Sequence, residues 1–192
     1  MNKKIFYLLI GFIFTLSCFG CDYENYEQLN NKYIKNLDYK ASIRLNSACI
    51  AKKPEARFYY NRANTYRRAK KFDSAIKDFE KAIDLKPDYA AAYVSLARLD
   101  NEIGNYEKAI LGLNKALSIE PNNPTIYNTR GNLKMIKGDY DGALDDFKKA
   151  KDLGFYTKTL DYNIRAVMYY KKSPPEKQRV LPSYIESVRI NE

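Results

Sequence analysis

The apolar positions of this 192-residue chain recur with a step of 34 residues between residue 56 and about residue 157. Five positions keep that step through three units: Ala63, Ala97 and Gly131; Phe72, Tyr106 and Tyr140; Ala75, Ala109 and Ala143; Phe79, Leu113 and Phe147; and Ala82, Ala116 and Ala150. A fixed period of this length indicates a repeat architecture, in which one supersecondary unit occurs several times. The repeat therefore predicts the fold.

Each unit is predicted to hold two helices, because apolar residues fall twice in succession at i, i+4 and i+7, one face of a helix. In the first unit these sets are Tyr59, Ala63 and Tyr66, then Ala75, Phe79 and Ala82. Residues 68–72 between the sets leave room only for a turn. The turn of the second unit holds Gly104, a residue that adopts the left-handed conformation without steric cost.

The sequence also predicts where the second helices begin and end. Asp73 and Asp141 stand near predicted starts, where a carboxylate can accept from the first amides. Lys86 precedes Pro87 and is pushed out of the α region, so a helix is expected to end there. The acidic residues around Asp141 hint at a calcium loop. They lack the required alternation of oxygen ligands, so a helix cap is the favoured interpretation.

Small residues let two antiparallel helices approach closely, and one such pair cannot bury its apolar face unless others stack on it. The 34-residue unit has small residues at the crossings, an aromatic residue before the second helix and a closing proline. It resembles the tetratricopeptide repeat. The resemblance implies an all-α, right-handed solenoid. Tyr59, Tyr93 and Tyr127 depart from it where the family often has Trp, as does Lys70 where the other two units have glycine.

Weaker repeats are predicted on both sides of the clear units. Tyr39 stands 33 residues before Phe72, with Asn30 in the place of a small residue and Asn46 in the place of an aromatic one. The predicted segments are a signal peptide at 1–21, a divergent repeat at 22–55, repeats at 56–89, 90–123 and 124–157, a capping helix at 158–172 and a polar tail at 173–192. In the capping helix, Tyr162, Ala166 and Tyr169 are read as the apolar set of a first helix.

The first 21 residues are interpreted as an export signal. Two lysines precede an apolar run at 5–19, which is short for a membrane-spanning helix of about 20 apolar residues. Gly20 before Cys21 resembles the end of a bacterial lipoprotein signal, which implies that Cys21 is lipidated. Cys18 is the alternative site, and a plain cleaved signal is the third interpretation. With Cys21 lipidated and Cys18 removed, Cys49 is a lone thiol, interpreted as a small buried apolar residue.

Composition narrows the function classes. The formal charge of +10 favours acidic partners or anionic lipid heads, and the export signal disfavours nucleic acid. The chain has no histidine, the commonest general base and metal ligand, and it contains neither a phosphate-binding glycine loop nor a Cys/His cluster. No enzymatic activity, cofactor, metal site or small-molecule substrate is therefore expected.

The tetratricopeptide resemblance implies that the first helices line a concave groove in which ligands lie. Rotating away from the Tyr/Ala stripe places a set of polar and basic residues there: Arg57, Tyr60, Asn64, Arg67, Arg68, Arg98, Asn128 and Asn132. The neighbouring units extend this set with Glu27, Asn31, Lys35, Val94, Asn101, Glu102, Met135 and Ile136. Asn side chains can pair with peptide backbone and Arg with carboxylates, so an extended acidic segment or a free C-terminus is the predicted ligand.

The preferred hypothesis is a lipid-anchored scaffold or adaptor of the bacterial cell envelope, on its periplasmic or surface face. Its partners would be other proteins, such as a membrane-associated complex. One alternative is a structural protein that associates with itself through its solenoid ends. Another is an envelope enzyme or carbohydrate-binding protein, which would need convergent acids, whereas the acids here are dispersed over helix exteriors.

Overall fold

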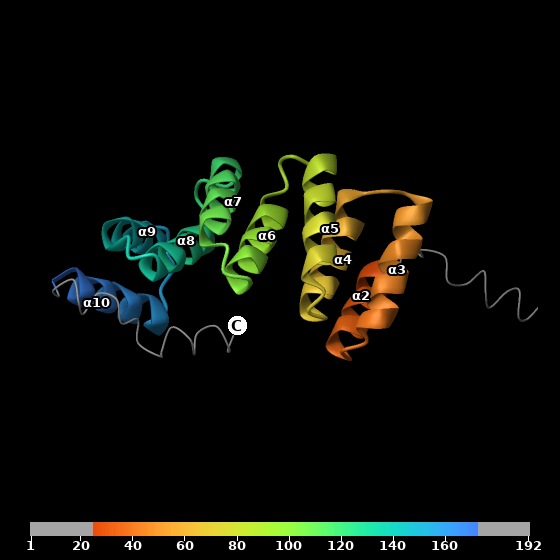
Figure 1. Cartoon of the computed structure of the whole chain (residues 1–192), viewed down its shortest axis with the longest axis horizontal. Coiled ribbons are helices and arrows are strands. Elements are labelled where there is room, and N and C mark those ends of the chain that lie inside the picture. Colours follow the sequence, from red (N-terminus) through yellow and green to blue (C-terminus); the bar gives the residue numbers. More distant parts are fainter. Residues whose placement is uncertain (1–24, 173–192) are drawn as a thin grey trace, which may run out of the picture. The chain divides into compact units, whose positions relative to one another are not determined.

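The computed structural model describes residues 25–172, so the predicted signal peptide and the tail at 173–192 lie outside the described residues. Every regular element within 25–172 is an α-helix (Figure 1). The helices are α2 (Tyr26–Lys35), α3 (Tyr39–Lys52), α4 (Ala56–Arg68), α5 (Phe72–Leu85), α6 (Ala90–Glu102), α7 (Tyr106–Ile119), α8 (Pro124–Ile136), α9 (Tyr140–Asp152) and α10 (Lys158–Lys172). The predicted all-α helical repeat fold is confirmed. None of these helices combines the length and apolar character needed to cross a membrane.

The chain divides into two compact units, and each is described by itself. Unit 1 ends at Ala92 and contains α2 to α5. Unit 2 begins at Tyr93 and contains most of α6 together with α7 to α10. Within each unit a helix packs on the helix that follows it, as α3 does on α4 and α8 on α9.

Small residues lie where paired helices cross. Ala63 of α4 and Ala75 and Ala82 of α5 are fully buried. Gly131 of α8 shows how little room there is, because a Cβ added to it would stand 2.7 Å from the ring of Phe147 on α9. Repeated small positions thus permit the close approach of the two helices of a pair.

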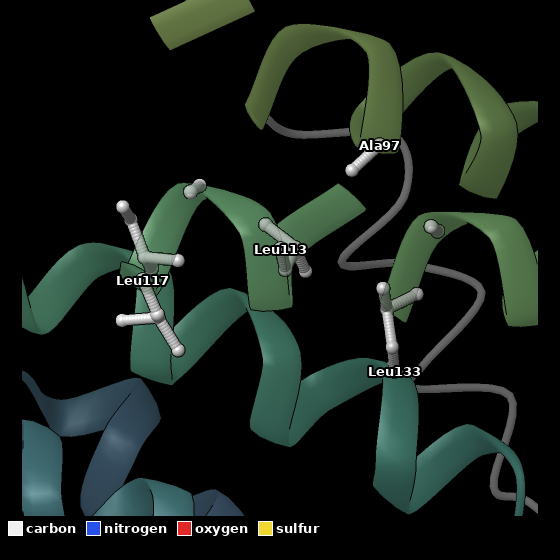
Figure 2. Close-up of a cluster of buried hydrophobic side chains, with 7 residues drawn as sticks. Ala97, Leu113, Leu117 and Leu133 are labelled. Carbon is white, nitrogen blue, oxygen red and sulfur yellow. The ribbon is translucent and has the colours of Figure 1, made fainter. Parts of the chain in front are cut away.

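The first helices also bury a second stripe, which the sequence analysis missed. Its members are Phe58 and Thr65 on α4, Ala92 and Leu99 on α6, Ile126 and Leu133 on α8, and Leu160 and Val167 on α10, all with 3% exposure or less. Phe58 clusters with Tyr26, Leu45 and Cys49 of the preceding pair. Figure 2 shows Leu113 of α7 between Leu117 of the same helix and Leu133 of α8, with Ala97 of α6 in the same cluster. In α4 and α8, one stripe therefore faces the second helix of the same pair, and the other faces the pair before it.

The apolar set read on the terminal helix is wrong. Tyr162 and Tyr169 are 44% and 63% exposed, whereas Leu160, Asn163 and Val167 form the buried face of α10. Since α10 begins at Lys158, one 34-residue step after Pro124, the predicted set lies one residue out of register. With the correct register, Tyr162 stands 34 residues after Asn128 and therefore occupies a position outside the core.

Two predicted helix caps also differ from the structure. Asp139, not Asp141, caps α9, because its carboxylate accepts from the Gly142 amide at 3.0 Å. Asp141 lies in the first turn, where it accepts from the Lys171 ammonium of α10. Asp73 likewise lies inside the first turn of α5, where a negative charge favours the helix dipole without capping.

Two arginines, Arg62 and Arg130, each form hydrogen bonds to two other helices. Arg62 of α4 donates to both carboxylate oxygens of Asp78 on α5, at 2.7 and 2.8 Å, and to Ser47 Oγ on α3 at 2.9 Å. The hydrogen bonds to Asp78 and its negative charge raise the pKa of Arg62. Arg130 of α8 repeats the arrangement two steps of 34 later, with Asp146 on α9 and Asn114 on α7. The intervening unit has Leu96 and Gly112 at the equivalent positions. The pair is therefore kept or replaced as a whole.

The divergent first pair keeps its core by hydrogen bonding. Asn46, in the place of an aromatic ring, accepts from the Tyr26 hydroxyl at 2.6 Å and donates to Asn30 Oδ1 at 2.9 Å. Ser42 donates to the same Asn30 oxygen at 2.9 Å and bonds Thr65 Oγ1 of α4. These side chains are buried. Because each has a partner, burial does not leave unsatisfied polar groups in this pair.

We predict that Lys70→Gly stabilises the protein. Lys70 has φ 57°, in the left-handed region, and the equivalent Gly104 has φ 83°. A side chain costs about 1–2 kcal/mol there, and the added entropy of unfolded glycine offsets part of this. The free energy of unfolding in urea should rise by up to about 1 kcal/mol. The reverse exchange, Gly104→Lys, serves as the control and should lower it, whereas equal effects of both substitutions would refute the argument.

A double-mutant cycle tests the Arg62–Asp78 pair. Asp78→Ala leaves the largely buried guanidinium of Arg62 without its carboxylate partner. It should lower the free energy of unfolding by about 2–4 kcal/mol. Adding Arg62→Leu, the residue type of the intervening unit, should recover at least about 1 kcal/mol of that loss. Additive effects of the two substitutions would show that the pair is not coupled.

Candidate protein-binding surface

Five of the predicted site residues share one face of α4, which is called the α4 row: Arg57, Tyr60, Asn64, Arg67 and Arg68. At 3.6 residues per turn they lie within an arc of about 100°, turned away from buried Phe58 and Thr65. Arg68 is exposed, and the other four are half-buried. The core stripes of α4 thus leave this face to solvent.

Arg57 is already engaged within the protein. Its Nε lies 2.8 Å from Glu55 Oε2, and its guanidinium lies over the Phe58 ring, 4.5 Å from the centroid. The hydrogen bond from Lys53 and the charge of Arg57 lower the pKa of Glu55. Arg57 therefore brings less uncompensated charge to an acidic ligand than the sequence prediction assumed.

Tyr60 belongs to an aromatic cluster that the sequence analysis missed. Its ring centroid lies 5.0 Å from that of Tyr89 and 6.0 Å from that of Phe79, while Lys86 Nζ lies 5.1 Å from the Tyr89 centroid. Burial, together with nearby Tyr60 and Glu27, raises the pKa of Tyr89 to about 12. Tyr89 is the last residue of the first clear unit, directly after Lys-Pro-Asp. The next two units have Asn123 and Thr157 at this position, so the repeat pattern did not indicate an aromatic residue here.

The asparagines make internal hydrogen bonds. The Asn64 amide donates to the Tyr60 carbonyl at 3.1 Å, and Asn132 Oδ1 accepts from Asn163 of α10 at 2.8 Å. These bonds orient both side chains. They also use part of the hydrogen-bonding capacity that the sequence analysis assigned to the backbone of a peptide ligand. Asn128, one turn before Asn132 on α8, is half-buried.

The remaining site residues lie as follows. Arg98 of α6 is exposed, and Glu27, Asn31 and Lys35 of α2 are exposed as well. Met135 was placed in the predicted groove, but it is 3% exposed and packs with Phe147 and Val167. The structure brings together the α4 row in unit 1, and Asn128 with Asn132 in unit 2. One groove through both units stays a prediction.

Among the described residues, no group of three or more His, Cys, Asp or Glu side chains could hold a metal ion. Cys49 of α3 is fully buried, as predicted for a small apolar residue, and it is disulfide-bonded in this structure of the whole 192-residue chain. The lone-thiol interpretation concerns a chain that has lost Cys18 and carries lipid on Cys21, so it stays a prediction. Cys18 and Cys21 lie outside the described residues.

Three sequence models of the tetratricopeptide repeat match the chain, at residues 56–89, 97–135 and 124–153. A curated relative, the small glutamine-rich tetratricopeptide repeat-containing protein 2 of Saccharomyces cerevisiae, is 35% identical over 74 residues. That match covers 38% of this chain and 21% of the relative, so the chain spans about a fifth of the relative's length.

Solved structures agree on the fold. A crystal structure of MamA aligns at TM-score 0.63 and 26% identity, over 69% of this chain and 78% of that one. The first TPR of Spaghetti (RPAP3), bound to the HSP90 peptide SRMEEVD, aligns at TM-score 0.59 and 18% identity. It covers 62% of this chain and 94% of that one, and at this identity the likeness shows the fold alone.

Proposed function

We propose that this tetratricopeptide repeat protein is a non-catalytic scaffold or adaptor that binds an extended, acidic peptide segment of another protein. The observation that carries the proposal is the α4 row, in which exposed Arg68 and half-buried Arg67 share a helix face with Tyr60, whose ring packs on half-buried Tyr89. Repeats of this kind generally bind other proteins or peptides, as the SRMEEVD complex illustrates.

The chemistry of the row suits a peptide with carboxylates. Arg68 is exposed and Arg67 half-buried, and a guanidinium can grip a carboxylate with two parallel hydrogen bonds. The rings of Tyr60 and Tyr89 would cover an apolar side chain between two such contacts. Glu27, which lies close enough to Tyr89 to influence its pKa, would repel an acid at that end. The carboxylates of the ligand therefore belong toward Arg67 and Arg68.

The proposed location is the bacterial cell envelope, with the protein held to a membrane by lipid on Cys21. The proposal rests on the basic start, the apolar run and the Gly20-Cys21 junction of the sequence. Two or more acyl chains suffice for stable anchoring. A partner that is itself part of a membrane complex would then meet the repeats near the membrane surface.

Binding of an acidic peptide can be measured with fluorescent SRMEEVD. Arg68→Glu should weaken binding about tenfold, because an exposed cation that attracts carboxylates becomes an anion. The matched control is Lys77→Glu, the same charge change at an exposed position of α5 in the same unit. Equal weakening by the two substitutions would reduce the effect to net charge and contradict the site assignment.

Mass spectrometry of the mature protein tests the anchor. We expect an N-terminal Cys21 carrying diacylglycerol, and Cys21→Ala should abolish acyl labelling and membrane retention. A chain that begins at a lipidated Cys21 has no second cysteine to bond Cys49 internally, so Cys49 should then be a thiol or linked between chains. A mature chain with an internal disulfide at Cys49 would contradict lipidation at Cys21.

A further inference from the structure

The turn between α2 and α3 holds an exposed leucine in an uncommon backbone conformation. Leu37 has φ 57°, in the left-handed region that residues other than glycine rarely adopt, and its side chain is 68% exposed. The equivalent residues of the three clear units are Lys70, Gly104 and Gly138. Leucine at this position therefore combines a backbone cost with an apolar side chain in water.

The packing of the helices does not require a side chain at this position. A Cβ added to Gly104 or to Gly138 would have no atom beyond its chain neighbours within 4 Å, so the position lies outside the packed pair. Leu37 itself is not part of the buried cluster that Tyr26 and Phe58 form in unit 1. A costly residue that adds nothing to the core is a candidate for contact with something outside the protein.

Lysines flank Leu37 on both adjoining helices. Lys32 and Lys35 lie in the last turn of α2, and Lys40 lies in the first turn of α3. All three are exposed. The apolar side chain of the turn thus projects between positive charges.

The turn between α4 and α5 adds a fourth lysine at the same end of unit 1. Ser42 Oγ lies 2.9 Å from Thr65 Oγ1, so the start of α3 lies beside the end of α4 and the two turns are neighbours (Figure 1). Lys71 of the second turn is exposed. We call Leu37 together with these four residues the lysine tip: Lys32, Lys35, Lys40 and Lys71.

Two acids at this end offset only part of the positive charge. The Asp38 carboxylate accepts from the Ala41 amide at 2.9 Å, and Asp73 lies in the first turn of α5. Both carboxylates stand at the starts of helices, where the helix dipole already favours a negative charge. The lysine tip therefore keeps an excess of positive charge around Leu37.

An apolar residue on a projecting turn with lysines around it fits the surface of a bilayer. Leucine can enter the boundary between headgroups and acyl chains, while long lysine side chains hold their ammonium groups at the level of anionic headgroups. The centre of a protein interface is instead a buried patch of several apolar side chains. The neighbours of Leu37 along the turn, Asn36 and Asp38, are polar and exposed.

We propose that the lysine tip contacts a membrane surface that contains anionic lipid. Leu37 inserts below the headgroups, and the four lysines bind the headgroups around it. This contact is additional to the lipid proposed on Cys21, and it fixes which end of unit 1 faces the membrane.

A tryptophan at the tip would report insertion, because the chain has no tryptophan of its own. The full-length Leu37→Trp chain is reconstituted in phosphatidylcholine vesicles with or without phosphatidylglycerol. With phosphatidylglycerol, its emission should shift to shorter wavelength, and brominated acyl chains should quench it at least about twofold more strongly. The matched control is Leu85→Trp, 43% exposed and at the far end of α5 in the same unit, which should show no such difference.

The lysines are tested in the Leu37→Trp chain. Lys35→Glu with Lys71→Glu should abolish the additional quenching, because anionic lipid then repels the tip. Lys81→Glu with Lys86→Glu makes the same charge change at exposed positions away from the tip and should preserve the quenching.

Three outcomes would overturn the proposal. Equal quenching in the two kinds of vesicle would show that anionic lipid does not hold the tip. Equal loss from the two lysine pairs would reduce the effect to net charge. Shielding of the tryptophan from aqueous iodide without quenching by brominated lipid would make a protein the occupant. Mass spectrometry measures the lipid on Cys21 separately, so each proposal can fail without the other.

Discussion

The constraint on which the whole structure depends is that a single helix pair cannot bury its own apolar surface. The first helices α4 and α8 therefore carry two buried stripes each. The small residues and their neighbours face the second helix of the same pair, whereas Phe58, Ile126 and, on α10, Leu160 face the pair before. The two stripes leave only one face of α4 to solvent, and the α4 row lies on that face. The binding surface is thus what remains after packing between and within pairs has been satisfied.

Polar contacts in this array follow the same geometry. Arg62 bonds to the second helix of its own pair and to that of the preceding pair, so one side chain holds the contacts within and between pairs. The exchange of arginine and aspartate for Leu96 and Gly112 in the middle unit is understandable in these terms, because either charge alone would be stranded in a partly buried position. The Asn30–Asn46 contact in the divergent pair is a second such joint replacement.

The surface that results is less strongly charged than a count of its arginines suggests. Arg57 is held by Glu55, and Asn64 and Asn132 make bonds inside the protein. Arg68 and Arg98 are exposed and would attract carboxylates, and the Tyr60–Tyr89 pair lies in the same unit as Arg68. Specific recognition by this protein would then depend on a few residues that differ between units, because the residues shared by the units form the core.

The sequence by itself determined the helices, their pairing and the left-handed turn at Gly104, because a 34-residue period and small residues at crossings leave few other ways to bury the apolar positions. It also placed Arg57 to Arg68 on one face of a helix, since that follows from helical periodicity alone. Only the tertiary structure decided which neighbours each face meets. In the tertiary structure, Phe58 and Thr65 are buried in the core, whereas Tyr162 and Tyr169 are exposed. The ring of Tyr60 packs on that of Tyr89, and Arg57 forms an ion pair with Glu55. Periodicity reports how a helix alternates its faces, whereas contacts between pairs depend on residues far apart in sequence.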